Sequence, residues 1–327
     1  MRAHMKRIMS LIILFLLTSN LSGCISPESV SDELSSNSDD LSNDELFTLE
    51  THCIEFETPE RCWLLLVPNN VTQDITVPLV IDLHGMGDTN QMQFELSAFV
   101  ELAVEENFIV AYPQGEELIW SIDVEEVDNG LDDIGFLLEM IASIKGMYSI
   151  DESRIHMTGW SMGCMMTQFF AVETQGILAS AGCMSGYLMT EAPSTYSPPV
   201  PFMEVHGVLD PSLQYGDNSV NFMYGFQSTK GMNRGAMQNL DYWRDINGCN
   251  GIMPEIIEIN DDFDIRGYTD CEDGTEVRLM SLFLAQHNPY LNDHDVHDAS
   301  GNPTGTPSTR ILWDFMSQFQ RADSALI

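Results

Sequence analysis

The sequence contains few basic residues. Its 327 residues include 13 Lys and Arg against 50 Asp and Glu, which gives a formal net charge of −37 at pH 7. Phosphate contacts need clustered Lys and Arg, so this composition argues against a nucleic-acid-binding protein. It argues equally against attachment to anionic lipids through a polybasic patch. The apolar fraction of 44% is ordinary for a folded chain and argues against wholesale disorder.

The N-terminal apolar segment is too short to cross a bilayer, which takes about 20 residues. It covers Ile8–Leu17, follows Lys6 and Arg7, and matches the h-region of a signal peptide. The sequence Leu-Ser-Gly-Cys that ends at Cys24 resembles the lipobox of prokaryotic lipoproteins, in which the Cys is lipidated. We expect residues 1–23 to be a lipoprotein signal peptide and Cys24 to be the lipidation site. The protein would then be extracytoplasmic, lipid-anchored or secreted; a cleaved signal with an incidental Cys is the alternative.

No basic residue occurs in the segment that follows Cys24. Ile25–Leu46 holds seven Ser and seven Asp or Glu, and it is too polar to bury a core. We expect residues 24–49 to form a disordered acidic tether and residues 50–327 to form the folded domain. The spacing of the acidic residues does not match a Ca²⁺-binding loop. Because the tether holds only seven of the 50 acidic residues, most of the charge belongs to the folded domain, which favours a salt-adapted surface.

The seven cysteines show no CxxC pair and no Cys/His spacing typical of a metal site. We therefore expect no metal and no cofactor. An exported chain with six cysteines besides Cys24 is typical of a disulfide-containing protein. The pairings that sequence proximity favours are Cys53–Cys62 and Cys249–Cys271. Cys164 and Cys183 remain, either as a third disulfide or as two buried thiols.

Strands and helices alternate after residue 76. Apolar, β-branched runs predict strands at 77–83, 108–112, 154–158, 179–184, 201–206 and 277–285. Helical spacing of apolar residues predicts helices at 91–106, 136–144, 162–174 and 310–319. Asp132 and Asp133 suit the N-terminus of the second of these helices. The alternation predicts an α/β fold, with a mostly parallel central sheet and helices on both faces, in one large domain.

A possible nucleophile lies between the strand 154–158 and the helix 162–174. Gly159-Trp160-Ser161-Met162-Gly163 is a GxSxG motif, and a nucleophile elbow of the α/β-hydrolase type needs this strand–turn–helix context. The two glycines leave room for a tight turn on which Ser161 is presented. The alternative is a structural β–α turn that is rich in small residues and has no catalytic role. The context favours Ser161 as a catalytic nucleophile.

A serine nucleophile needs a base and an orienting carboxylate, which in an α/β-hydrolase follow the serine in the order acid, then His. Asp210 comes just after the strand 201–206 and is the expected acid, although an Asp-Pro turn is the alternative. His287 follows the last predicted strand and is the expected general base. The oxyanion donors are expected from the amides of Met162 and Met86, the latter in the loop His84-Gly85-Met86-Gly87.

The other histidines fit these roles less well. His84 and His206 end strands but precede Ser161 or Asp210 in the chain, and His156 lies inside a strand, where it is expected to pack. His294 and His297 belong to the acidic segment 292–298. That segment could offer His and Asp ligands to a metal, but an exposed loop is the favoured interpretation.

The motifs together resemble the polyhydroxybutyrate depolymerase and feruloyl or acetylxylan esterase-like α/β-hydrolases. The matching stretches cover roughly residues 50–320: PLVIDLHGMG, FIVAYPQG, NGLDDIGFL, RIHMTGWSMGCM, VHGVLDPSLQYG and WRDINGC. The resemblance implies the same triad, a disulfide from Cys249 to the downstream Cys271, and a structural role for Asp133. The chain departs from the family before the base, where Leu284-Ala285-Gln286 replaces a Gly-rich stretch.

The leading functional interpretation is a serine esterase whose partner is a small-molecule or oligomeric ester. Hydroxyalkanoate oligomers and feruloyl or acetyl esters of polysaccharides are the substrates that the resemblance implies. Two alternatives remain. One is a serine peptidase that uses the same groups on peptide bonds, and the other is a catalytically inactive surface-binding protein on a hydrolase scaffold.

Overall fold

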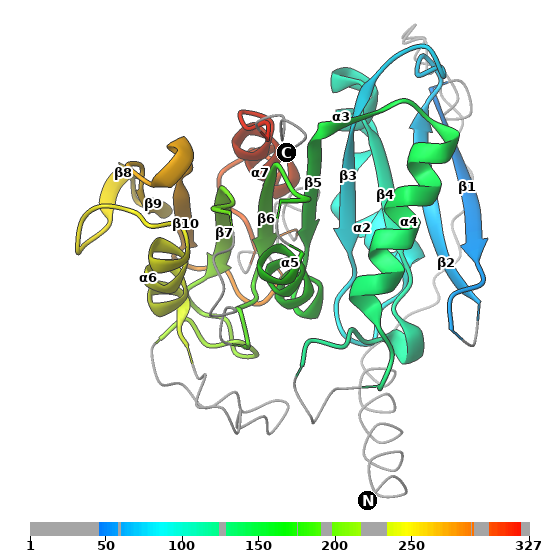
Figure 1. The fold of residues 1–327 in the computed structure, drawn as a ribbon. Helices are drawn as coiled ribbons and strands as arrows, with labels where there is room; N and C mark the ends of the chain where they lie inside the picture. The colour runs from blue at the N-terminus through cyan, green and yellow to red at the C-terminus, as the bar shows by residue number, and fades with distance from the viewer. Residues whose placement is uncertain are drawn as a thin grey trace, which may run out of the picture. The chain divides into compact units, whose positions relative to one another are not determined.

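One mixed β-sheet organises the part of the chain that the computed structural model describes. This part comprises residues 46–57, 60–123, 129–174, 176–190, 198–216, 234–288, 290 and 301–321. The sheet has the order β1-β2-β4-β3-β5-β6-β7-β10-β9-β8 (Figure 1). Its strands are β1 (Phe47–Ile54), β2 (Arg61–Pro68), β3 (Val77–Leu83), β4 (Ile109–Pro113), β5 (Ile150–Gly159), β6 (Ser180–Met184), β7 (Phe202–Gly207), β8 (Glu255–Ile259), β9 (Phe263–Tyr268) and β10 (Val277–Leu282).

The central strands are parallel, as the alternation of strands and helices predicts. β4, β3, β5, β6, β7 and β10 pair in parallel with one another. Antiparallel pairs complete both edges, with β2 and β1 beyond β4 and with β9 and β8 beyond β10. The sequence interpretation missed these four edge strands. Every residue of β8 is exposed, so β8 carries no buried apolar run that periodicity could detect.

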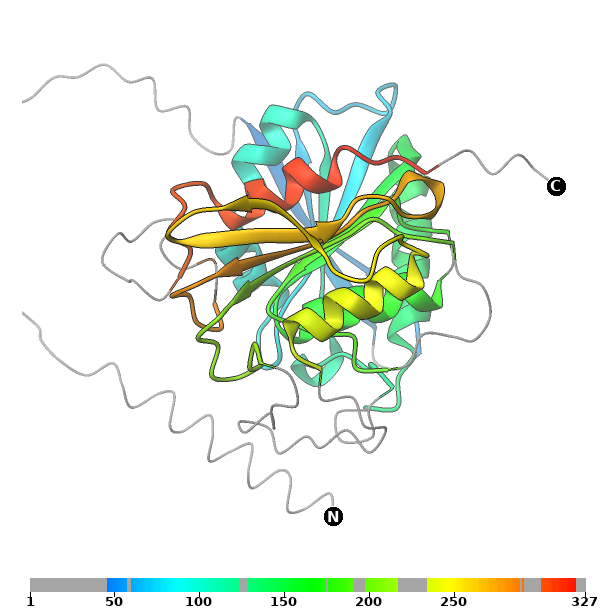
Figure 2. The same ribbon diagram turned by 90° about the vertical axis from the view of Figure 1, so that its left-hand side faces the viewer.

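Helices cover both faces of the sheet. They are α2 (Asn90–Ser97), α3 (Phe99–Glu106), α4 (Asp133–Met147), α5 (Met162–Glu173), α6 (Ala236–Ile246) and α7 (Ser308–Met316), with short 3-10 turns at Glu116–Leu118 and Glu272–Gly274. α4, α5 and α6 lie on one face, and α2, α3 and α7 lie on the other (Figures 1 and 2). The first face carries the larger buried core, while two smaller clusters fill the second face. No described helix is long and apolar enough to cross a membrane.

Two predicted elements differ from the structure. The helix predicted at 91–106 is two helices, because Ala98 adopts a left-handed conformation (φ 51°) that ends α2 and begins α3. The strand predicted at 277–285 ends at Leu282, and the amide of Ala285 then closes a turn on the carbonyl of Leu282. This turn redirects the chain toward His287. β1 begins at Phe47, three residues before the predicted start of the folded domain.

The described cysteines form three disulfides: Cys53–Cys62, Cys164–Cys183 and Cys249–Cys271. The first joins opposite residues of the β1–β2 pair. The pair that the sequence left open is therefore a disulfide and not two thiols. The expected lipidation site Cys24, the signal peptide and residues 24–45 of the tether lie outside the described residues.

Candidate active site

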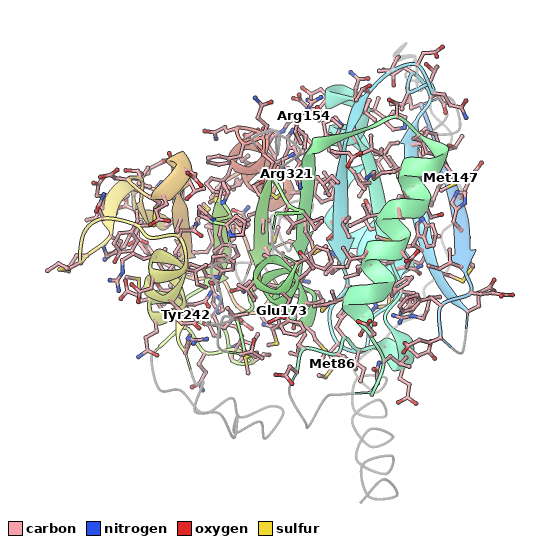
Figure 3. The ribbon with its side chains drawn as sticks, in the orientation of Figure 1. Met86, Met147, Arg154, Glu173, Tyr242 and Arg321 are labelled. Atoms are coloured by element: carbon pink, nitrogen blue, oxygen red, sulfur yellow. A yellow bond between two sulfur atoms is a disulfide. The ribbon has the colours of Figure 1, made fainter. Side chains whose placement is uncertain are left out.

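The carboxyl ends of the parallel strands bring the predicted site residues to one edge of the sheet. Ser161 follows β5, Asp210 follows β7, and His287 follows β10. Met86, in the loop after β3, lies at this edge, whereas Arg154 lies toward the opposite edge (Figure 3). In open α/β sheets, ligands bind beyond the carboxyl ends of the strands. Topology alone therefore assembles the candidate site.

Ser161 occupies a strained turn between β5 and α5. Its φ of 56° and ψ of −117° lie outside the regions that residues with a side chain normally adopt. The turn presents the hydroxyl at the first turn of α5, where amide groups have no intrahelical acceptor. Ser161 itself is 6% exposed. This is the geometry of a nucleophile elbow.

The glycines beside Ser161 are required by backbone contacts. A Cβ at Gly163 would lie 2.1 Å from the carbonyl oxygen of Leu83 in β3. A Cβ at Gly159 would lie 2.7 Å from the backbone of Gly163 and 2.8 Å from the same carbonyl. β3, β5 and α5 approach so closely here that no side chain fits. The motif's spacing thus has a steric reason.

Ser161, His287 and Asp210 form a continuous hydrogen-bonded chain. The Oγ of Ser161 lies 2.9 Å from Nε2 of His287, and Nδ1 of His287 lies 2.7 Å from Oδ2 of Asp210. The other oxygen of Asp210, Oδ1, accepts the backbone amides of Ser212 and Leu213 at 2.7 and 2.9 Å. A carboxylate that accepts on both oxygens fixes Nδ1–H of the imidazole, which leaves Nε2 free to accept the serine proton.

The charge of Asp210 is strongly favoured despite its burial. Burial alone raises the pKa of this carboxyl, but the hydrogen bonds from His206 and His287 outweigh burial and hold the pKa well below its usual range. Asp210 is therefore ionised at every pH at which the imidazole could act as a base.

A second histidine lies under Asp210. Nε2 of His206 is 3.4 Å from Oδ2 of Asp210, and Nδ1 is 2.7 Å from Oε1 of Glu204. Burial by itself lowers the pKa of His206. The two carboxylates raise it by more than burial lowers it, so that the pKa is about 10. Burial raises the pKa of Glu204. The sequence interpretation set His206 aside on chain order and gave no role to Glu204; only the spatial contact with Asp210 reveals them.

The loop after β3 is held by a neutral histidine. Nδ1 of His84 donates to the carbonyl of Gly85 at 2.8 Å, and Nε2 accepts the amide of Gly115 at 2.9 Å. Burial lowers the pKa of His84 to about 4, so the ring remains uncharged at neutral pH. The indole of Trp120 donates to the His84 carbonyl at 2.9 Å. These contacts fix the loop that carries Met86.

Two backbone amides remain available beside Ser161. Met162 is the first residue of α5, so its amide has no intrahelical acceptor. The amide of Gly87 is already bonded to the carbonyl of Leu118 at 2.8 Å, which removes Gly87 as a donor to substrate. In the part of the chain that the structure describes, the amide of Met86 has no such acceptor. Met86 and Met162 thus remain the candidate oxyanion donors.

Trp160 and Asp88 are neighbours of His287 that the sequence interpretation did not single out. The Trp160 indole donates to the His287 carbonyl at 2.8 Å, and the two rings lie 5.4 Å apart between centroids. Asp88 interacts electrostatically with His287; burial raises the pKa of Asp88 to about 6, while His287 opposes the rise. Trp160 is the second residue of GxSxG, a position that the motif leaves unspecified, so no sequence signal marked it.

Asp82 is a buried carboxyl in β3, two residues before His84. Its Oδ1 accepts the side-chain amide of Gln93 at 2.8 Å, and the Ser97 hydroxyl also interacts with the carboxyl. Burial raises the pKa of Asp82 to about 7. The charge of Asp82 thus depends on pH near neutrality.

The other residues that the sequence singled out lie away from Ser161 or outside the described part of the chain. His156 is fully buried, and Nδ1 lies 2.8 Å from the Ser180 hydroxyl. Asp133 is buried in an ion pair with Arg61 and accepts the Ser121 amide at 2.7 Å. Asp132 caps α4 through the amide of Gly135. His294 and His297 lie outside the described residues.

The described structure is similar to a solved esterase. An acetyl xylan esterase from Aspergillus awamori matches with a TM-score of 0.55 over 73% of this chain and 94% of that chain, at 18% sequence identity. The chain has the α/β-hydrolase fold. The fold class predicted from the sequence is therefore confirmed.

Sequence relatives of this chain carry esterase and depolymerase names. Feruloyl esterase B of Piromyces equi is 24% identical over 261 residues, which are 77% of this chain and 44% of the relative. A bifunctional acetylxylan esterase/xylanase of Neocallimastix patriciarum is 32% identical over 138 residues, 42% of this chain and 20% of the relative. Poly(3-hydroxyalkanoate) depolymerase C of Paucimonas lemoignei is 29% identical over 116 residues, 33% of this chain and 28% of the relative.

The predicted resemblance of the chain to the esterase and depolymerase group is confirmed by these names. The matches span less than half the length of each of these relatives. No family model matches the sequence.

Proposed function

We propose that the protein is a serine esterase that hydrolyses carboxylic esters through an acyl-enzyme intermediate. The hydrogen-bonded chain from Ser161 through His287 to Asp210 carries this proposal. The three residues come from separate strand ends, so their alignment to within hydrogen-bonding distance is not a local feature of the sequence. The esterase names of the relatives support the same reaction class.

In the first half of the reaction, Ser161 Oγ attacks the ester carbonyl carbon while Nε2 of His287 takes the hydroxyl proton. Asp210 stabilises the imidazolium that forms. The negative charge on the former carbonyl oxygen faces the amides of Met86 and Met162 and the N-terminus of α5. The C–O bond to the alcohol then breaks, and the alcohol leaves with the proton from His287.

In the second half, water attacks the acyl carbon and gives its proton to Nε2 of His287. The bond to Ser161 Oγ breaks, the serine regains a proton from the imidazolium, and the carboxylic acid departs. The cycle consumes one water and needs no metal or cofactor. Asp210 remains ionised throughout, because it accepts hydrogen bonds on both oxygens.

For the substrate, we propose acetyl or feruloyl esters of polysaccharides, or hydroxyalkanoate oligomers. The names of the relatives support these classes. The carboxyl of Asp88 beside His287 favours neutral over anionic esters, because a second negative charge in a partly buried site is repelled. For the location, we propose a site outside the cytoplasm with anchoring through Cys24; the three disulfides support an oxidising compartment.

The test is the loss of ester hydrolysis in Ser161→Ala, measured on p-nitrophenyl acetate, feruloyl methyl ester and 3-hydroxybutyrate oligomers. A fluorophosphonate probe should label the wild type and leave Ser161→Ala unlabelled. Ser153→Ala is the matched control, since Ser153 lies in the first half of β5, away from the turn that carries Ser161. Equal labelling of the wild type and Ser161→Ala would contradict the assignment.

The same panel separates the two alternatives. Turnover of aminoacyl amides that exceeds turnover of the matching esters would favour a peptidase. A wild type that neither hydrolyses any ester nor reacts with the probe would favour a surface-binding protein.

A further inference from the structure

Beneath Asp210, a charged pair is buried that the triad mechanism does not use. Glu204 and His206 point to the same side of β7, two residues apart, and both are essentially inaccessible to solvent. Buried charges are costly unless they are paired and hydrogen-bonded, so a pair at this place calls for a physical account.

The partners of His206 fit a doubly protonated ring. Nδ1 faces a carboxylate oxygen of Glu204 at 2.7 Å. Nε2 faces the Leu213 carbonyl at 2.8 Å and the Asp210 carboxylate at 3.4 Å. The Tyr187 hydroxyl lies 3.1 Å from Nε2 but donates to the Gln214 carbonyl at 3.0 Å, so it accepts from His206. Nε2 thus faces acceptors and carries a proton, and Nδ1 shares a second proton with the Glu204 carboxyl.

The partners of Glu204 fit an ionised carboxylate. Oε1 accepts from His206, and Oε2 accepts from the side-chain amide of Asn239 in α6 at 2.8 Å. No proton is needed on either oxygen. The carboxylates of Glu204 and Asp210 hold the pKa of His206 at about 10, so the proton shared with Glu204 resides on the ring. Glu204 and His206 thus form a carboxylate–imidazolium pair whose net charge is close to zero.

The imidazole ring of His206 is held on both sides. Tyr187 stacks on it with ring centroids 5.0 Å apart and planes 3° from parallel, and Tyr215 meets it edge-on at 5.9 Å. The ring cannot turn without losing these contacts and its hydrogen bonds. Its Nε2–H consequently has a fixed direction, toward the carbonyl of Leu213 and toward Oδ2 of Asp210.

We propose that the Glu204–His206 ion pair is a positioning device for Asp210 that supplies a fixed cation beneath the catalytic acid. The proposal rests on the proposed esterase function, because it concerns the acid of that triad. Asp210 receives amides on Oδ1 and both histidines on Oδ2, so its carboxylate plane is set from two directions. Glu204 neutralises the positive charge of His206. The negative charge of Asp210 therefore remains available to stabilise the imidazolium of His287.

The electrostatic part of the proposal predicts a direction. Among the residues that the structure describes, the charged groups that face His287 are Asp210, Asp88 from the loop after β3, and, behind Asp210, the Glu204–His206 pair. In Glu204→Gln the side chain keeps its size, while the cation on His206, still held by Asp210, loses its counter-charge. Added positive charge disfavours protonation of His287.

The experiment compares pH profiles of kcat/KM on a neutral ester. The acidic limb follows protonation of the free enzyme's base. Glu204→Gln should move this limb to lower pH by about 1 unit, the order expected for one buried charge at this range. Tyr187→Phe is the matched control, since it removes a hydroxyl contact to His206 without a change in charge, and its limb should stay in place. An unmoved or raised limb in Glu204→Gln would overturn the proposal.

Two further measurements separate positioning from general destabilisation. His206→Gln should lower kcat by about 10-fold and leave KM within about 2-fold, because it disturbs the triad but not substrate contacts. In the wild type, ¹⁵N NMR of labelled histidines should show both ring nitrogens of His206 protonated at pH 8. A neutral ring at pH 8 would overturn the proposal even if the variants fail to fold.

The NMR result does not depend on catalysis. A wild type that shows the charged ring but hydrolyses no ester would contradict the proposed function and the positioning of its acid, and it would leave the ion pair itself established.

Discussion

The effect of Asp210→Asn on catalysis can be predicted from the hydrogen bonds that Asp210 makes. An Asn side chain has the same shape but carries one acceptor oxygen and one NH2 donor. In the wild type, Oδ1 meets two backbone amides, from Ser212 and Leu213, while Oδ2 meets Nδ1 of His287. The new side chain must therefore choose which of its ends faces which partners.

The choice follows from counting donors. If the NH2 faced the two backbone amides, it would create two donor–donor contacts that cannot rearrange. If it faces His287, Nδ1 can give up its proton and accept, and only the longer contact with His206 becomes unfavourable. The second orientation is therefore preferred. It forces the proton of His287 onto Nε2, which then donates to Ser161 instead of accepting the serine proton.

The loss of the base by a tautomer switch costs about 10⁴-fold in kcat, or about 5.5 kcal/mol of transition-state stabilisation. The assay is kcat for p-nitrophenyl acetate at pH 7.5, with circular dichroism to show that the variant folds. Ser161→Ala provides the background rate. A folded Asp210→Asn that kept more than about a tenth of the wild-type kcat would refute the tautomer argument.

Three other predictions concern stability. Burial raises the pKa of Asp82 to about 7, from 3.8 for an Asp side chain in water, so burial of this carboxyl costs stability as the pH rises between these values. In urea unfolding, Asp82→Asn should gain about 3 kcal/mol on the wild type between pH 4.5 and 7, and a constant difference would contradict this. Gly163→Ala should fail to form the elbow and lose soluble, active protein, because its Cβ would meet the Leu83 carbonyl at 2.1 Å. Gly146→Ala in α4, where a Cβ meets nothing within 4 Å, is the control and should stabilise the helix by about 0.5–1 kcal/mol. With a net charge of −37, the melting temperature should rise between 0.1 and 2 M NaCl, and a flat response would argue against a salt-adapted surface.

Much of the fold was predictable because short stretches of the sequence determine its strands and helices. The parallel strands carry apolar, β-branched runs in sequence order, and the helices between them carry apolar residues at helical spacing. The elbow was predictable because Gly159 and Gly163 bracket Ser161 at fixed spacing. Asp210 and His287 were found from chain order and from their positions after strands, and the structure places both within hydrogen-bonding reach of one another. Their catalytic roles stay predictions until the variants are measured.

Tertiary structure alone decided the features that join distant segments. The left-handed backbone of Ala98 separates α2 from α3, although the helical spacing of apolar residues continues across it. The sequence pattern does not record backbone conformation, so it could not predict this break. The edge strand β8 pairs without a buried face, so only its hydrogen bonds to β9 reveal it. His206 looked like any histidine at a strand end; its charge depends on Glu204 beside it and on Asp210 beyond the turn. The sequence determined which groups are present and in what order, whereas the charge and direction of each group depend on neighbours that only folding brings within a few ångströms.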